Sequence, residues 1–295
     1  MKLNGIEIED TFAEAFDIKV SRFLITANDY DLAMECAKEA TGFATSIIMC
    51  PAEAGVDVLA KPDETPDGRV GVYVMVCHPD EKKLEKQLLA RIGQCVLPFP
   101  TTAVFDALPD SKDRFRVGYK IKFFGDGFEE EVEVGGRRCW RIPIMEGEFV
   151  IEDSFGVIDG VAGGNFVIMA ETQASALIAA KAAVDAISTV EGVITPFPIV
   201  ASGSKVGARR YGFLKASTNE MFCPTLRGRI ETSLPPNVKG VYEIVINGIS
   251  LNAVKEAMRV GISAAVKVQG VVRISAANFE GKLGNYKIEL NDLFD

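Results

Sequence analysis

The sequence contains a single histidine, His78, and its six cysteines form no Cys-x-x-Cys pair. Metal sites built from imidazole and thiolate ligands need such residues clustered at short spacing, so we expect no metal. His78 follows an apolar run and precedes Pro79, which is typical of a loop residue. We therefore expect His78 to be neither a ligand nor a catalytic base.

Long apolar runs are also missing, since none approaches the roughly 20 residues that a membrane-spanning helix requires. Met1-Lys2-Leu3 leads directly into Asn4-Gly5 and an acidic segment, which does not match a secretory signal. Scattered cysteines in apolar surroundings are typical of reduced thiols. These features together predict a cytoplasmic protein that does not engage a membrane.

Basic residues are outnumbered, with 32 lysines and arginines against 41 acids and a net charge of −9. Such a surface repels phosphodiester backbones, which disfavours nucleic acid as a partner. A local positive pocket for an anionic ligand is still compatible with this charge, because basic pairs occur at Arg137-Arg138 and Arg209-Arg210.

Repeated phrases indicate that the chain contains one domain twice. Ile8-Glu9-Asp10-Thr11-Phe12 returns as Ile151-Glu152-Asp153-Ser154-Phe155, and Tyr119-Lys120-Ile121 returns as Tyr286-Lys287-Ile288. Each half then opens on the same signature and closes on the same alternating strand. We expect two lobes, residues 1–146 and 147–295, that superpose Phe12 on Phe155 and Tyr119 on Tyr286.

Within each half, apolar strand-like runs lead into helical patterns and then into further strands. The strands that precede the helices are expected at 23–25, 72–76, 166–169 and 244–246. The helices are expected at 29–40, 81–92, 177–187 and 251–265. In the first half, the strands that follow the helices are expected at 45–49 and 95–97. Asp29 and Asp80 stand where helix N-caps are wanted. Two βαβ units per half predict an α+β fold of two ferredoxin-like, split βαβ lobes.

One carboxylate stands inside an apolar strand. Glu243 lies in Val241-Tyr242-Glu243-Ile244-Val245-Ile246, where apolar residues continue on both faces. It either points to solvent from an edge strand or lies in a buried site that raises its pKa. In the second case it is a proton donor and acceptor near neutral pH.

Glycine-rich segments are the other candidates for binding. The segment 160–166 does not fit the dinucleotide fingerprint and reads as a tight turn or a close approach to a ligand. Ser204-Lys205-Val206-Gly207 matches Gly281-Lys282-Leu283-Gly284, whose lysines and backbone amides either bind carboxylates or are simply solvated. Cys50 lacks a histidine base, so we expect any transfer chemistry of this chain to run directly between two bound substrates rather than through a covalent enzyme intermediate.

Four motifs and the C-terminal half carry a resemblance to a known family. The motifs are Asn4-Gly5-Ile6-Glu7-Ile8-Glu9-Asp10-Thr11-Phe12-Ala13-Glu14-Ala15-Phe16, Met49-Cys50-Pro51-Ala52-Glu53-Ala54-Gly55, Phe123-Phe124-Gly125-Asp126-Gly127 and Val161-Ala162-Gly163-Gly164-Asn165-Phe166. With Val241 to Gly248 and Asp292-Leu293-Phe294, they closely resemble the formylmethanofuran:tetrahydromethanopterin formyltransferase family over essentially the whole chain.

The resemblance implies an archaeal one-carbon enzyme that moves a formyl group from methanofuran to N5 of tetrahydromethanopterin. It also implies a homotetramer built from dimers, a cleft at the subunit contacts, and no cofactor, since the two carriers are substrates. Glu243 matches the carboxylate that handles the proton of the amine. The cleft candidates that follow from the same resemblance are Arg259, Asn165, Gly163, Gly164, Asp153, Ser154 and Lys282.

Two alternatives remain open at this point. The chain is also compatible with a formyltransferase subunit of a bacterial formyltransferase/hydrolase complex. Duplicated ferredoxin-like lobes also occur in regulatory modules that bind ligands without chemistry.

Overall fold

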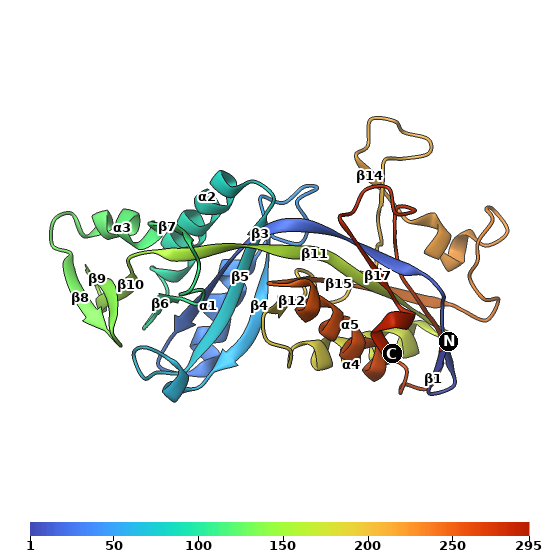
Figure 1. Cartoon of the computed structure of the whole chain (residues 1–295), viewed down its shortest axis with the longest axis horizontal. Helices are drawn as coiled ribbons and strands as arrows, with labels where there is room; N and C mark the ends of the chain where they lie inside the picture. The colour runs from blue at the N-terminus through green and yellow to red at the C-terminus, as the bar shows by residue number, and fades with distance from the viewer. Residues whose placement is uncertain (295) are drawn as a thin grey trace. The chain divides into compact units, whose positions relative to one another are not determined.

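The computed structural model describes residues 1–294, which form two compact units (Figure 1). One unit comprises residues 18–160, and the other comprises residues 1–17 together with 161–295. The chain passes between the units inside two long strands, β3 (Phe12–Thr26) and β11 (Phe155–Ala170). Each unit is described separately below.

The unit of residues 18–160 has the ferredoxin-like arrangement. Its elements are β3, α1 (Tyr30–Thr41), β4 (Glu53–Ala60), β5 (Gly71–His78), α2 (Glu81–Arg91) and β6 (Ala103–Asp106). The strands lie in the order β4-β5-β3-β6, and every neighbouring pair is antiparallel. Asp29 and Asp80 cap the two helices by accepting the N–H groups of Leu32 and Lys83, as the sequence predicted.

The other unit repeats this topology. Its elements are β11, α4 (Gln173–Ile187), β12 (Val193–Ile194), β15 (Gly240–Gly248), α5 (Leu251–Ala265) and β16 (Val271–Ser275). The order is β12-β15-β11-β16, again antiparallel throughout. The predicted α+β class with split βαβ lobes is therefore confirmed. A long insertion, residues 195–239, separates β12 from β15 and contains the hairpin of β13 (Lys205–Val206) and β14 (Ala216–Ser217).

Parallel strands extend each sheet. β2 (Ile6–Ile8) pairs with β16, and β10 (Gly147–Glu152) pairs with β6. Shorter additions are β1 (Lys2–Leu3) on β2, and β8 (Glu130–Val134) and β9 (Arg137–Ile144) beside β10. The opening strand of each sequence half thus pairs with the last ladder strand of the other half. One compact unit is therefore discontinuous in sequence and the other is continuous over residues 18–160. The boundary between residues 146 and 147 stays a prediction about the duplication.

Three local predictions were wrong. Tyr119 lies in the short helix α3 (Val117–Ile121), whereas Tyr286 begins strand β17 (Tyr286–Glu289), so the two phrases are not structurally equivalent. Residues 45–49 form a turn whose apolar side chains are exposed, and the returning strand β4 starts only after Pro51. The predicted strand at 95–97 is absent, because a π-helical turn over Ile92–Val96 extends the end of α2, and the strand follows at β6.

In the unit that includes residues 1–17, side chains along each strand point alternately to the two faces of the sheet. Phe166, Ile168, Ile244 and Ile246 are buried with the inner faces of α4 and α5. The opposite face carries Val167, Met169 and Val241, which pack with Leu234 and Val238 of the insertion. This second face therefore lies beneath the insertion. In residues 1–294 no helix combines the length and hydropathy needed to cross a membrane.

Candidate functional site

Glu243 lies on an inner strand rather than at a sheet edge. β15 pairs with β11 on one side, where Glu243 stands opposite Val167. On the other side, Glu243 and Val200 exchange two backbone hydrogen bonds, of 3.0 Å from Glu243 N and 2.9 Å to Glu243 O. The solvated edge position that the sequence left open is therefore excluded.

The Glu243 side chain occupies the apolar face covered by the insertion. Its neighbours on the strand, Tyr242 and Ile244, point toward the helices, so the carboxyl group points toward Val167 and the insertion. Burial alone raises the pKa of Glu243 to about 7. No hydrogen bond or ion pair from residues 1–294 offsets that burial. Near neutral pH this carboxyl group is thus divided between its acid and base forms.

A cavity of about 290 Å³ opens at Glu243. Its wall combines strand residues with the insertion and the segment after β16, and it includes Val167, Val200, Ser202, Asn219, Cys223, Thr225, Lys239, Glu243 and Ala277. The volume is at the lower end for small-molecule sites. Polar groups, one cation and one carboxyl group of shifted pKa converge here, which is the arrangement expected of a site for acid–base chemistry.

The side-chain amide of Asn165 is hydrogen-bonded to backbone groups, including those of Ala277 in the cavity wall. Its Nδ2 donates to Gly163 O and to Ala277 O, both at 3.0 Å, and its Oδ1 accepts from Ala277 N at 2.7 Å. Both amide hydrogens are therefore engaged. In this arrangement Asn165 positions Ala277, and donation from its amide to a substrate would require those bonds to break.

Gly163 and Gly164 have structural roles in strand β11. Gly163 has φ +89° at a bulge in the pairing with β15, and its N–H donates to Asn247 Oδ1 at 3.1 Å. A Cβ on Gly164 would lie 2.2 Å from Val254 Cγ1 of α5. Gly164 thus allows a close approach to a helix of the same unit, whereas a Cβ on Gly163 would meet Phe16 Cδ2 of β3 at 3.4 Å.

The glycine loop that contains Lys282 does bind a carboxylate, but one from the same chain. Glu14 is buried in β3 and accepts the N–H groups of Phe279, Gly281, Leu283 and Gly284, the first three at 2.6 to 2.9 Å. Lys282 itself is exposed and pairs with Glu280. The signal for Glu14 was available in the sequence, because it is an acid inside the alternating run Phe12-Ala13-Glu14-Ala15-Phe16.

Arg259 is placed away from this cavity within its unit. It lies on α5, where its guanidinium pairs with Glu256 at 2.6 Å on the exposed side of the helix. The inner side of α5 packs on the sheet face opposite Glu243. Arg259 therefore does not join Glu243 in the cavity, and a role in binding stays a prediction.

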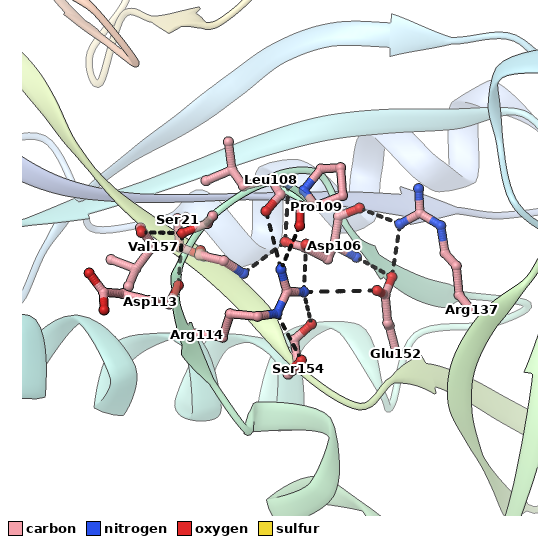
Figure 2. Close-up of polar contacts among 12 residues, drawn as sticks. Ser21, Asp106, Leu108, Pro109, Asp113, Arg114, Arg137, Glu152, Ser154 and Val157 are labelled. Atoms are coloured by element: carbon pink, nitrogen blue, oxygen red, sulfur yellow. Dashed lines mark hydrogen bonds and ion pairs between the residues drawn. The ribbon is translucent and has the colours of Figure 1, made fainter.

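Asp153 and Ser154 belong to the unit of residues 18–160. Ser154 lies in an arginine–carboxylate network (Figure 2). Buried Asp106 accepts from Arg114 Nη2 at 2.7 Å and from Gly156 N at 2.9 Å. Arg114 also donates to Ser154 Oγ at 3.0 Å. Burial acts to raise the pKa of Asp153, but hydrogen bonds from Trp140 and Arg116 outweigh it and lower that pKa. These bonds give both residues a structural function here.

The remaining candidates for nucleophile or base are placed as follows. His78 Nδ1 accepts the N–H of Asp80 at 2.8 Å, at the start of α2, and burial lowers the pKa of this imidazole. Cys50 lies 3.5 Å from Thr45 Oγ1 in the unit of residues 18–160. Cys223, which sequence reasoning passed over, lines the Glu243 cavity. Across residues 1–294, no group of three or more His, Cys, Asp or Glu side chains could hold a metal ion.

Known proteins resemble the chain over its full length. A family model described as formylmethanofuran-tetrahydromethanopterin formyltransferase matches residues 1–144, and one described as FTR, proximal lobe, matches residues 147–293. The formylmethanofuran–tetrahydromethanopterin formyltransferase of Archaeoglobus fulgidus is 65% identical over 297 residues, with 100% of each chain covered. The protein of that name from Methanothermobacter thermautotrophicus is 60% identical over 297 residues, also with 100% of each chain covered.

Two solved structures are similar in fold as well. The formyltransferase from Methanosarcina barkeri matches with a TM-score of 0.98 and 57% identity, covering 100% of both chains. A chain of the formyltransferase/hydrolase complex of Methylorubrum extorquens, solved with methylofuran, matches with a TM-score of 0.95 and 44% identity, covering 100% of this chain and 99% of that one.

Proposed function

The chain belongs to the formylmethanofuran–tetrahydromethanopterin formyltransferase family and is an enzyme that transfers a formyl group, and we propose that it does so directly between two bound carriers. The donor is formylmethanofuran and the acceptor is N5 of tetrahydromethanopterin. Both carriers act as substrates, and no further cofactor takes part. The observation that carries this mechanism is the Glu243 carboxyl group, whose pKa is raised to about 7 in a cavity.

In the proposed reaction the acceptor nitrogen attacks the formyl carbon and forms a tetrahedral adduct. The Glu243 carboxylate removes the proton of the attacking amine. It then returns that proton to the methanofuran nitrogen, so that this C–N bond breaks and a neutral amine leaves. A pKa near 7 suits both steps, because the group exchanges its proton readily at neutral pH. Ser202, Thr225 and Lys239 of the cavity wall offer donors to the developing oxyanion.

Cys223 supports a second mechanism that the kinetics distinguish. Its thiol lies in the cavity wall and donates to Asn219 O at 3.4 Å, and the Glu243 carboxyl group lies in the same wall. A formyl-thioester on Cys223 would let the donor leave before the acceptor binds. The direct mechanism is favoured because the cavity contains no histidine to activate the thiol.

Initial rates with both carriers varied test the proposal. Direct transfer predicts intersecting double-reciprocal lines and no exchange of labelled formyl between enzyme and donor in the absence of tetrahydromethanopterin. Cys223→Ala should keep most of the activity. Parallel lines, together with a formylated Cys223 found by mass spectrometry, would show that the transfer is covalent.

The chain is proposed to act without a hydrolase subunit. It is 65% identical to the Archaeoglobus fulgidus formyltransferase and 44% identical to the chain of the bacterial formyltransferase/hydrolase complex. The regulatory, non-catalytic alternative does not account for this family membership. The assay above, run on the purified chain alone, also decides whether a second subunit is needed.

We further propose a cytoplasmic homotetramer built from dimers. Exposed apolar side chains support an interface, because Phe43 and Met49 are 74% and 82% exposed in one unit and Ile178 is 57% exposed in the other. Acidic subunits should associate more readily as salt screens their repulsion. Analytical ultracentrifugation at physiological and high salt measures this, and monomers in both conditions would rule the tetramer out.

A further inference from the structure

The insertion of residues 195–239 has a charge opposite to that of the rest of the chain. It carries seven basic residues and two acidic ones, a net charge of +5, within a chain of −9. The other 250 residues therefore carry −14. The basic residues are Lys205, Arg209, Arg210, Lys215, Arg227, Arg229 and Lys239. Such segregation on an acidic protein indicates a local site for anions.

Most of these cations form no ion pair with another side chain of residues 1–294. Lys205 pairs with Glu220, and Arg227 donates to Pro235 O and Val238 O, so these two stabilise the insertion itself. The exposed side chains of Arg209, Arg210, Lys215, Arg229 and Lys239 form no ion pair with any of residues 1–294. By contrast, Arg259 and Arg273 elsewhere in this unit are both paired with glutamates.

The hairpin of the insertion is anchored beside the Glu243 cavity. β13 and β14 pair from Lys205 to Ser217, which leaves residues 207–215 as the connecting loop, and Figure 1 shows this hairpin projecting from its unit. The Lys205–Glu220 ion pair fixes its base, and Asn219 next to Glu220 lines the cavity. Lys239 also lines the cavity, so positive charge is present at the cavity wall and in the hairpin loop.

The loop also exposes aromatic surface. Tyr211 and Phe213 are 52% and 82% exposed, their ring centroids are 5.9 Å apart, and Arg210 lies 5.6 Å from the Tyr211 ring centroid. Exposed aromatic side chains next to unpaired arginines suit a ligand that combines an apolar stem with negative groups.

We propose that the loop of residues 207–215, with Lys239, binds the anionic substituent, a carboxylate or phosphate chain, of one C1 carrier while the reacting head of that carrier lies at Glu243. This rests on the proposed function for the identity of the carriers. The loop contributes binding energy remote from the reacting atoms, so it lowers Kd and KM and leaves proton transfer to Glu243.

The test compares two double charge reversals that change net charge equally. R209E/R210E alters the loop, whereas K181E/K267E alters exposed lysines on α4 and after α5 in the same unit. Calorimetric titration of each carrier separately measures binding without requiring turnover. R209E/R210E should weaken one carrier about tenfold at low salt, about 1.4 kcal/mol, and the difference should shrink in 1 M KCl, where screening acts over about 3 Å.

Competition identifies the anionic group, since inorganic phosphate or a glutamate oligomer should displace that carrier from the wild-type protein but not from R209E/R210E. If R209E/R210E binds both carriers as tightly as K181E/K267E, the loop is not the anion site. If wild-type protein binds the carriers through the loop but transfers no formyl group, the proposed function fails and the anion site stands.

Discussion

Glu243→Gln should lower turnover by about 100-fold or more, because the amide keeps the shape of the side chain but cannot exchange a proton. The wild-type pKa is raised to about 7 by burial, so kcat/KM for the acceptor should rise with pH through the neutral region as the carboxylate form appears. This rise of kcat/KM with pH should be absent from the Glu243→Gln variant. Steady-state rates from pH 5.5 to 9 measure both effects.

Three control variants separate this role from other chemistry. His78→Ala and Cys50→Ala lie in the unit of residues 18–160 and should remain near wild type. Cys223→Ala changes the wall of the same cavity without removing the acid–base group. Full turnover of Glu243→Gln with an unchanged pH profile, together with loss of activity in one of the cysteine or histidine variants, would oblige us to abandon direct transfer.

The topology could be predicted because its signals are local. The helix face of α5 follows from the spacing of Val254, Met258 and Ile262, all of which are buried. Apolar composition predicted a strand at residues 45–49, but this segment pairs with no strand within residues 1–294, and the side chains of Ile47 and Met49 stay exposed. Strand formation depends on pairing and burial as well as on composition.

The site was predictable in part for the same reason. Glu243 stood out as an acid between apolar residues, but its inner position depends on hydrogen bonds to Val200, more than 40 residues away in the chain. Asn165 was recognised without its role, because its partner Ala277 is 112 residues away. The Glu14 contacts span more than 260 residues. Sequence patterns show which side chain is unusual, and only the fold shows what it touches.

The buried Glu14 carboxylate should be the main stabilising group of the segment that follows Ala277. Its four backbone donors, on residues 279 to 284, have no other acceptor within that loop. Glu14→Gln would place an amide N–H against two of them, so we expect a loss of about 3 kcal/mol in the free energy of unfolding. Activity should also fall, because Ala277 forms part of the cavity wall.

The effect of Glu14→Gln should depend on pH with a defined sign. Burial acts to raise the pKa of Glu14, but the four backbone hydrogen bonds outweigh it and hold that pKa below the ordinary value of 4.5. A carboxylate with a depressed pKa stabilises the folded state above its unfolded pKa, and this contribution is lost as pH falls through the folded pKa. The Tm difference between wild type and Glu14→Gln should thus be largest above about pH 5 and shrink in more acidic buffer.

Glu280→Gln, which changes an exposed acid of the same loop, should leave Tm nearly unchanged. Equal Tm losses for the two variants, or a Glu14→Gln loss that does not vary with pH, would show that the carboxylate charge does not hold this loop.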